Sequence, residues 1–216
     1  MKMKDLALAQ VRRGERFTLD GVEFVKLEDD LDAAFAVAAD TLPECCQFED
    51  DDAEREDHNN YACSLLSKTV ERWLRDKHPA IFSAVVERPI DLTTMDGMTD
   101  YGKPLAVVRA LTIDEYRKHR SILPLTSKPY WLATGWTTNS SPYSYGDLAY
   151  SISAGGTVGD GGVCSAYFAP RPAFNLKSSI VVSDSTDSDG CYTVESVPGN
   201  DGGLYVKNNG LWVRAV

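Results

Sequence analysis

The stretch of sequence that decides the fold is residues 130–176, YWLATGWTTNSSPYSYGDLAYSISAGGTVGDGGVCSAYFAPRPAFNL. It opens on Tyr130-Trp131-Leu132, a short aromatic segment that is typical of a β-strand. It then runs through a long region rich in glycine, serine, asparagine and tyrosine, and it closes on the RPAFNL of residues 171–176. Rigid aromatic side chains, adaptable polar side chains and few charges are typical of a recognition surface rather than of an active site.

The sequence before this stretch predicts a hairpin near its start. Residues 16–27 alternate apolar and polar on both sides of Asp20-Gly21, a pair that suits a type I′ turn between two strands. The apolar residues 33–39 form either a short buried strand or a turn of helix, because periodicity cannot decide at this length. The strongly acidic residues 48–60 are typical of an exposed loop.

Two helices are predicted in the middle of the chain. The first ends near residues 78–79 and is capped either by residues 59–60 or by Ser64. Its apolar positions, which fall at helical spacing, are Leu65, Leu66, Val70, Trp73 and Leu74. The second begins after Thr112 as N-cap, with Glu115 three residues later completing a capping box.

Short segments around these helices are predicted from composition and turn residues. Residues 80–86 form either a second helical turn or the start of a strand, and residues 88–92 read as extended. Residues 96–104 are rich in turn residues and predict a loop. Residues 105–110 are apolar enough for a buried strand.

The last third of the chain predicts β-structure and loops. Residues 149–154 and 162–168 alternate enough to be strands, joined by the glycine-rich residues 155–161 as a hairpin connection. Residues 171–182 are expected to return to the sheet. The polar residues 183–190 are then typical of a linker.

The end of the chain reads as a β-meander over residues 191–213, and its last turn, Asn209-Gly210, is a strong hairpin signal. We therefore expect a main domain over residues 1–183 and a small β-appendage over residues 184–216. Two or three strands alone are only marginally stable. The appendage is thus expected to pack on the main domain, on a neighbouring subunit or on a larger assembly.

Composition narrows the class of partner. The chain has 216 residues and a formal net charge of −10, with a sequence pI of about 4.8. A protein this acidic is not expected to bind nucleic acid, which requires a basic face, or to adsorb to anionic membranes. No apolar run is long enough to cross a bilayer and no targeting segment is recognisable, so no membrane insertion is expected.

The thiols and imidazoles give no metal motif. An odd number of irregularly spaced cysteines without a Cys-x-x-Cys pair predicts free thiols in a protein made in the cytoplasm. They are Cys45, Cys46, Cys63, Cys164 and Cys191. The three histidines are scattered, and the aspartates of residues 184–189 lack the downstream glutamate of a calcium loop. The sequence therefore predicts no metal and no cofactor.

The order of these motifs resembles a known family. The matching segments are residues 14–27, 65–74, 112–116, 130–133, 149–158 and 171–177. Together they resemble a bacterial and phage domain family of unknown function with a C-type-lectin-like fold. That family is distantly similar to the formylglycine-generating sulfatase-modifying enzymes and to phage receptor-binding tip proteins. The resemblance covers about residues 12–182 and implies an α+β domain with a twisted, mostly antiparallel sheet, two main helices and long loops.

Chemistry known for the related proteins does not transfer to this chain. The formylglycine-generating enzymes use a reactive cysteine pair, and only Cys164 lies near the corresponding stretch. Sugar-binding C-type lectins hold calcium with Glu-Pro-Asn or Gln-Pro-Asp and Trp-Asn-Asp, and none of these tripeptides occurs. We therefore expect a protein that is not an enzyme and that binds no sugar through calcium.

The expected binding surface lies in the loop region of the opening stretch. Tyrosine and tryptophan offer large contact areas at a low entropy cost. The candidate residues are Trp136, Asn139, Tyr143, Tyr145, Asp147 and Tyr150, with Tyr167 as a further member. Trp131 is expected in the core, and Tyr150 and Tyr167 could also point inward from strands. Exposure is expected above all for Trp136, Tyr143 and Tyr145.

The resemblance and this surface together predict a phage or prophage virion component, such as a tail, fibre or capsid-surface protein. Its expected partners are a host surface protein or glycan, and itself or other virion proteins through residues 184–216. The alternatives are a cytosolic bacterial ligand-binding module and a divergent enzyme of the sulfatase-modifying type. The expected location is the virion after synthesis in the bacterial cytoplasm, or otherwise the cytoplasm.

Overall fold

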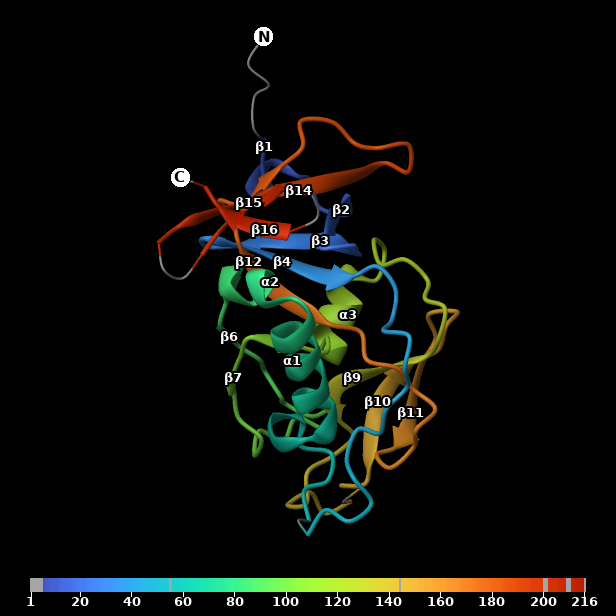
Figure 1. The fold of residues 1–216 in the computed structure, drawn as a ribbon. Coiled ribbons are helices and arrows are strands. Elements are labelled where there is room, and N and C mark those ends of the chain that lie inside the picture. Colours follow the sequence, from blue (N-terminus) through green and yellow to red (C-terminus); the bar gives the residue numbers. More distant parts are fainter. Residues whose placement is uncertain (1–5, 55, 144, 200–201, 209–210, 216) are drawn as a thin grey trace. The chain divides into compact units, whose positions relative to one another are not determined.

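The computed structural model describes residues 6–54, 56–143, 145–199, 202–208 and 211–215. The fold is α+β, as predicted, with twisted sheets and, in the described part of the chain, three α-helices. The chain forms two compact units (Figure 1). The first, here called the sheet unit, comprises Met1–Ala39, Trp73–Val86 and Ala173–Val216. The second, here called the loop unit, comprises Asp40–Arg72 and Glu87–Pro172.

The sheet unit is built on one large sheet in which strands from both ends of the chain alternate. Its order is β1-β13-β14-β2-β3-β4-β12-β5, with β15 and then β16 added beside β14. The strand bounds are β1 Leu6–Ala7, β2 Arg16–Leu19, β3 Val22–Asp30, β4 Ala33–Ala38, β5 Val85–Val86, β12 Ala173–Lys177, β13 Val181–Val182, β14 Cys191–Pro198, β15 Leu204–Asn208 and β16 Leu211–Arg214. Figure 1 shows the blue N-terminal strands beside the red C-terminal strands.

The predicted hairpin at the start of the chain is confirmed. β2 and β3 pair antiparallel with Leu19 opposite Val22. Asp20 and Gly21 both have positive φ, 52° and 82°, which a type I′ turn requires. The alternatives left open for residues 33–39 resolve to a strand, because β4 lies between β3 and β12 and all six of its residues are buried.

A buried lysine organises the edge of the sheet unit. Lys26, on β3, is 1% exposed. Its ammonium group donates to the carbonyls of Leu8, Ala9 and Val11 at 3.0, 3.1 and 2.8 Å. These carbonyls belong to the short 3-10 helix η1 (Leu8–Gln10) and to its C-cap. Asp29 accepts from the same group at 2.7 Å. The ammonium therefore gathers four acceptors.

The C-terminal residues are part of this sheet. β14 pairs in parallel with β2, placing Cys191 opposite Arg16, and antiparallel with β13. Cys191, Val194 and Val197 are buried. The structure thus divides the chain differently from the expected 1–183 and 184–216. The physical reason is that β14 supplies the second neighbour of β2, a pairing between distant residues that no local pattern records. The predicted Asn209-Gly210 turn lies outside the described residues.

The loop unit contains smaller sheets and longer connections. β9 (Tyr130–Gly135), β10 (Leu148–Ile152) and β11 (Val158–Gly162) form a sheet in the order β11-β10-β9. β6 (Arg88–Pro89) pairs with β7 (Leu105–Ala106), and β8 (Val108–Arg109) follows. The unit also holds the 3-10 helix η2 (Tyr61–Cys63) and the helix α3 (Ile113–His119). As expected, Trp131 is fully buried in β9.

The helices agree with their sequence signals. α1 (Leu65–Lys77) begins after Ser64, whose hydroxyl accepts from the backbone amide of Ser67 at 3.0 Å. Asn60 instead caps η2, so the open choice of cap resolves to Ser64. The capping box of Thr112 and Glu115 is present at α3. Residues 80–86, predicted as either a helical turn or the start of a strand, contain both: helix α2 (Pro79–Ala84) leads into β5.

Two expectations for the glycine-rich stretch are wrong in position. The strand expected at residues 162–168 lies earlier, as β11 at Val158–Gly162, and the connection is the shorter 153–157. Glycine fits this strand because aromatic rings lie on it. A Cβ atom at Gly161 would come within 2.6 Å of the Phe168 ring and 2.9 Å of Trp131. The absent side chain makes room for this packing, so a strand of low propensity forms.

Two expectations of burial are also corrected. The acidic residues 48–60 are not uniformly exposed, because Phe48, Glu49 and Asn59 are buried. Phe48 packs edge-on against Trp131, with ring centroids 5.7 Å apart, so the segment is anchored by its apolar residue. The strand expected at residues 105–110 is broken into β7 and β8, and Leu105 is 63% exposed.

Candidate functional site

The expected binding loop is organised by a fully buried asparagine. Asn59 is 0% exposed, and its carboxamide oxygen accepts from the Tyr101 hydroxyl at 2.6 Å. Its amide nitrogen donates to three backbone carbonyls, those of Thr137, Tyr145 and Leu148, at 2.9, 3.3 and 2.8 Å. These carbonyls lie at the start, middle and end of the loop. One side chain therefore fixes the path of the loop between β9 and β10.

Two aspartates tether the outer part of the same loop. Asp100 accepts from the hydroxyls of Thr138 and Ser140 at 2.6 and 2.7 Å. Asp96 accepts from Ser141 at 2.9 Å and from Thr94 at 2.5 Å. Hydrogen bonds to an ionised carboxylate are stronger than those between neutral groups. The predicted loop 96–104 thus serves as a scaffold for the binding loop.

Both carboxylates are held in the ionised form. The hydrogen bonds from Thr138 and Ser140 lower the pKa of Asp100. At Asp96, desolvation acts to raise the pKa, but the hydrogen bonds from Thr94 and Ser141 outweigh it and the pKa is lowered. The tethers therefore persist at neutral pH, where carboxylates are only acceptors.

The structure separates the six predicted surface residues into two groups. Tyr143 and Tyr145 are 78% and 52% exposed, and Asn139 and Asp147 are also exposed. Trp136 is half-buried and Tyr150 is buried. The rings of this second pair stack, with centroids 4.9 Å apart and planes at 17°, and burial raises the pKa of Tyr150. The exposed residues form the tip of the surface, and the stacked pair supports it.

The tip is further stiffened by a threonine inside the loop. The Thr137 hydroxyl accepts from the backbone amide of Tyr145 at 2.7 Å and donates to the carbonyl of Tyr143 at 3.3 Å. Both exposed tyrosines therefore extend from backbone that is bonded to a buried side chain. Such preorganisation lowers the entropy cost of binding.

Sequence reasoning missed the residues that hold the loop. From the sequence, Asn59 is predicted only as a helix cap, and Asp96 and Asp100 only as turn residues. Their partners lie 38 to 89 residues away, so no local pattern connects them. The one available signal is composition: hydroxyl residues cluster at 137–141, and carboxylate and amide residues form two separate runs elsewhere in the chain.

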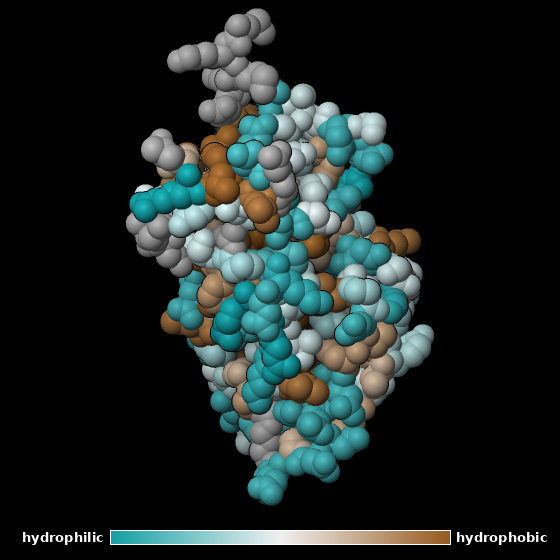
Figure 2. All heavy atoms as spheres, in the orientation of Figure 1, coloured by the Kyte–Doolittle hydropathy of each residue, from teal (hydrophilic) through white to brown (hydrophobic). Residues whose placement is uncertain are grey.

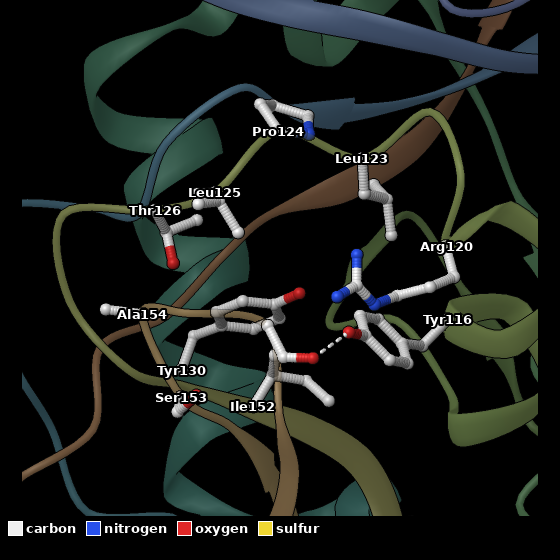
Figure 3. A pocket seen from close by; sticks show the side chains of 11 residues that line it. Tyr116, Arg120, Leu123, Pro124, Leu125, Thr126, Tyr130, Ile152, Ser153 and Ala154 are labelled. Atoms are coloured by element: carbon white, nitrogen blue, oxygen red, sulfur yellow. Dashed lines mark hydrogen bonds between the residues drawn. The ribbon is translucent and has the colours of Figure 1, made fainter.

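A pocket beside α3 is too small for an organic ligand. It lies under Arg120 and Tyr116, and the Tyr116 hydroxyl donates to the Gly156 carbonyl at 2.6 Å (Figure 3). Arg171, 1% exposed, donates to the Tyr130 hydroxyl at 3.0 Å. The cavity volume of about 10 Å³ is at the lower limit for one water molecule. The buried Tyr116, Tyr130 and Arg171 belong to the core of the loop unit, and Arg120 is exposed.

The cysteine of the glycine-rich stretch is not activated. Cys164 is exposed, but its hydrogen bond to Asp51, with burial and the charges of Asp50 and Asp147, raises its pKa to about 11. A thiolate is the nucleophilic form, and so this thiol is protonated at neutral pH. All five cysteines are free thiols. Among the described residues, no group of three or more His, Cys, Asp or Glu side chains is placed to hold a metal ion.

The described helices include none that is long and apolar enough to span a bilayer. Comparison with known proteins adds no relative to this geometry: no protein-family model, no curated protein and no solved structure matches the chain.

Proposed function

We propose that this chain is a non-enzymatic binding protein with a C-type-lectin-like fold, acting as a phage or prophage virion component. In this proposal the loop between β9 and β10 binds a host surface or a neighbouring subunit. One observation carries the proposal: Tyr143 and Tyr145 are exposed on a loop whose backbone is fixed by the buried Asn59. Exposed aromatic side chains on a fixed support are typical of a surface that meets a partner.

The chemistry of the loop favours recognition. The residues at its tip combine aromatic, amide and hydroxyl groups, with Asp147 as the only charged group among the six candidate residues. Tyrosine contributes contact area and a hydroxyl while losing few rotamers. The tethers to Asp96 and Asp100 hold the loop before a partner arrives. A binding role therefore accounts both for the exposed tyrosines and for the number of side chains that hold the loop in place.

The enzyme alternative lacks an activated group. The raised pKa of Cys164, about 11, is the reverse of what a nucleophilic or redox-active thiol requires. The cytosolic ligand-binding module remains the main alternative, because it would use the same loop. Assembly distinguishes the two, since a virion part is expected to form a defined oligomer.

The last hairpin of the sheet unit is the candidate assembly surface. Leu204, Leu211 and Val213 are 47%, 70% and 39% exposed. The pairing of Val206 with Val213 places these side chains on one face of β15 and β16. Figure 2 shows hydrophobic atoms gathered over these strands. Within the described residues β16 pairs only with β15, so its outer edge can accept a further strand.

The loop is tested by binding of the fluorescently labelled protein to a panel of bacterial cells. The double variant Tyr143→Ala/Tyr145→Ala should bind at least about tenfold more weakly than wild type, because aromatic anchors dominate such interfaces. Leu125→Ala, which removes a large apolar side chain of similar exposure (66%) in the same unit but outside the loop, is the matched control and should bind as wild type. Equal binding by the double variant and wild type would rule out the loop as the site.

Assembly is tested by light scattering. We expect a trimer or higher oligomer for wild type and a smaller species for Leu211→Lys, because a charge on the β16 face opposes apolar packing. Leu31→Lys, at a position 93% exposed in the same unit, should leave the mass unchanged. A wild-type monomer would favour the solitary binding module over the virion component.

A further inference from the structure

The loop unit has a second hollow, which lies on the sheet formed by β10 and β11. Its lining includes Pro129, Ser151, Ser153, Gly159, Tyr167 and Phe168. Its volume of about 410 Å³ falls in the range of small-molecule sites. None of the six candidate residues of the binding loop contributes to it. The groove is therefore a separate feature.

Glycine keeps the floor of this groove open. Gly159 lies opposite Ser151 in the β10–β11 pairing. A Cβ atom at Gly159 would contact only the Ser151 hydroxyl, at 3.7 Å, so a side chain could be accommodated at that atom without a clash. Its backbone is not in the left-handed region. Neither strain nor crowding thus requires glycine here, and its effect is to leave space.

One wall of the groove is aromatic. The Phe168 ring packs on Trp131 with centroids 4.2 Å apart, which fixes it in place. Tyr167 stands edge-on to Phe168, with centroids 5.3 Å apart and planes at 83°, and is 68% exposed. Tyr167 is thus an exposed aromatic ring held against the half-buried Phe168, and it offers an apolar face to a ligand in the groove.

The floor carries two hydroxyl groups. Ser151 lies on β10 opposite Gly159 and is 3% exposed. Its hydroxyl oxygen is the atom nearest a Cβ built at Gly159, at 3.7 Å, so it lies at the floor of the groove, where a hydroxyl can donate to or accept from a ligand. The Ser153 hydroxyl accepts from the backbone amide of Thr157 at 3.0 Å and keeps its own proton for donation.

The groove also carries no charge. The described residues that line it are serine, threonine, glycine, alanine, proline, valine and the two aromatics, in a chain of net charge −10. Fixed charges on a ligand would find no counterion here, and the acidic surroundings oppose anions. The lining therefore favours a neutral ligand that has both hydroxyl groups and an apolar face.

We propose that this groove binds a neutral sugar residue of a glycan, without calcium. The apolar face of the sugar ring packs on Tyr167, and its hydroxyls bond to Ser151 and Ser153. A peptide offers fewer hydroxyls for this floor, and an acidic sugar meets unfavourable charge. The proposal goes beyond the binding loop and does not depend on it.

The test uses the whole protein and ligand-observed saturation-transfer NMR with maltotriose, cellotriose, chitotriose and lactose, each at about 5 mM, a concentration suited to weak sites. We expect at least one of them to bind. Gly159→Leu, which fills the floor, and Tyr167→Ala should each weaken that binding at least about tenfold, since both remove most of the ring contact. Trigalacturonate, the acidic probe, should bind more weakly than the best neutral sugar.

Two matched controls locate the effect. Gly162→Leu lies on the same strand with nothing within 4 Å of its Cβ, on the opposite face, and should bind as wild type. Tyr143→Ala, in the binding loop, should also bind as wild type. If Gly159→Leu fails to fold, Ser151→Ala and Tyr167→Ala still test the site. Absence of binding by all four sugars, or binding unchanged in Tyr167→Ala and Ser151→Ala, would overturn the proposal.

Discussion

Each of the two units contains one buried side-chain nitrogen that donates hydrogen bonds to three backbone carbonyls. In the sheet unit the Lys26 ammonium donates to three carbonyls that lie 15 to 18 residues away. In the loop unit the Asn59 amide donates to three carbonyls that lie 78 to 89 residues away. Both nitrogens are buried. The first holds a short 3-10 turn beside its own hairpin, and the second holds the long loop between β9 and β10 that we propose for binding.

The difference lies in the charge. The Lys26 ammonium is positive, and its four acceptors include the Asp29 carboxylate at 2.7 Å, whereas the Asn59 amide is neutral. The longest of the three bonds that the amide donates, 3.3 Å, goes to the carbonyl of Tyr145. The loop unit thus keeps its weakest bond at an exposed tyrosine that we propose for binding.

The largest effect is expected from removing the charged organiser. Lys26→Met should reduce the free energy of unfolding by about 4 kcal/mol, because it leaves buried carbonyls without donors. Chemical denaturation measures this change. Lys77→Met, at an exposed lysine of the same unit, should change stability by less than about 0.5 kcal/mol. Equal effects of the two variants would show that the carbonyls find other donors.

A somewhat smaller effect is expected at the amide. Asn59→Ala should cost about 3 kcal/mol, because three carbonyls and the Tyr101 hydroxyl lose their partner, and it should weaken loop binding to cells. The neighbouring Asn60→Ala removes the cap of η2 and one hydrogen bond to Asp57 and should cost about 1 kcal/mol. If folded Asn59→Ala bound cells as well as wild type does, the hydrogen bonds of Asn59 would not be required for the loop to bind.

A third set of contacts in the loop unit, around Cys164, can be tested by chemical modification. Gln47 donates to the Cys164 carbonyl at 2.9 Å, and Asp51 bonds the thiol and raises its pKa to about 11. Alkylation of Cys164 by iodoacetamide at pH 8 should be about twentyfold slower than that of a free thiol, since fewer thiolates outweigh their higher nucleophilicity. Asp51→Asn should speed it. The rates are read by peptide mass spectrometry, with Cys164→Ser identifying the site, and a fast wild-type rate would contradict the assignment.

The smallest effect concerns the carboxylate tethers. The pKa of Asp100 is lowered in the folded state, so its contribution to stability is present above the ordinary value near 3.9 and is lost as pH falls through the folded pKa. Between pH 5 and pH 2 wild type should therefore lose slightly more stability than Asp100→Asn. The expected difference in Tm is about 1–2 °C. A larger loss in the variant would show that the charge does not stabilise the loop.

The sequence predicted the features that are written locally. The Asp20-Gly21 turn, the capping box at Thr112 and the apolar face of α1 each depend on residues within one or two turns of one another. The exposure of Tyr143 and Tyr145 followed from loop composition. Trp136, expected to be exposed on the same grounds, is half-buried because its ring stacks on Tyr150. The burial of Tyr150 could not be decided, because alternation along a strand does not say which face is covered.

What the sequence could not predict depends on distant pairing. The contacts of Asn59 cross most of the loop unit, and the parallel partner of β2 is a strand near the other end of the chain. β11 forms in a stretch that was predicted to be a connection. The Phe168 and Trp131 rings pack against Gly161, and strand propensity does not record that packing. Tertiary packing decided each of these points.

The pairing of β2 with β14 has a consequence for how the protein is made. The contact between Thr18 and Cys191 spans 173 residues, so all residues up to β14 must leave the ribosome before the large sheet can close. Most of the loop unit lies between those two strands in the sequence and is free to fold first. Until β14 arrives, one edge of β2 is an open template for other strands. We therefore expect synthesis to pass through a stage that is prone to aggregation, and chaperones to matter more for the sheet than for the loop.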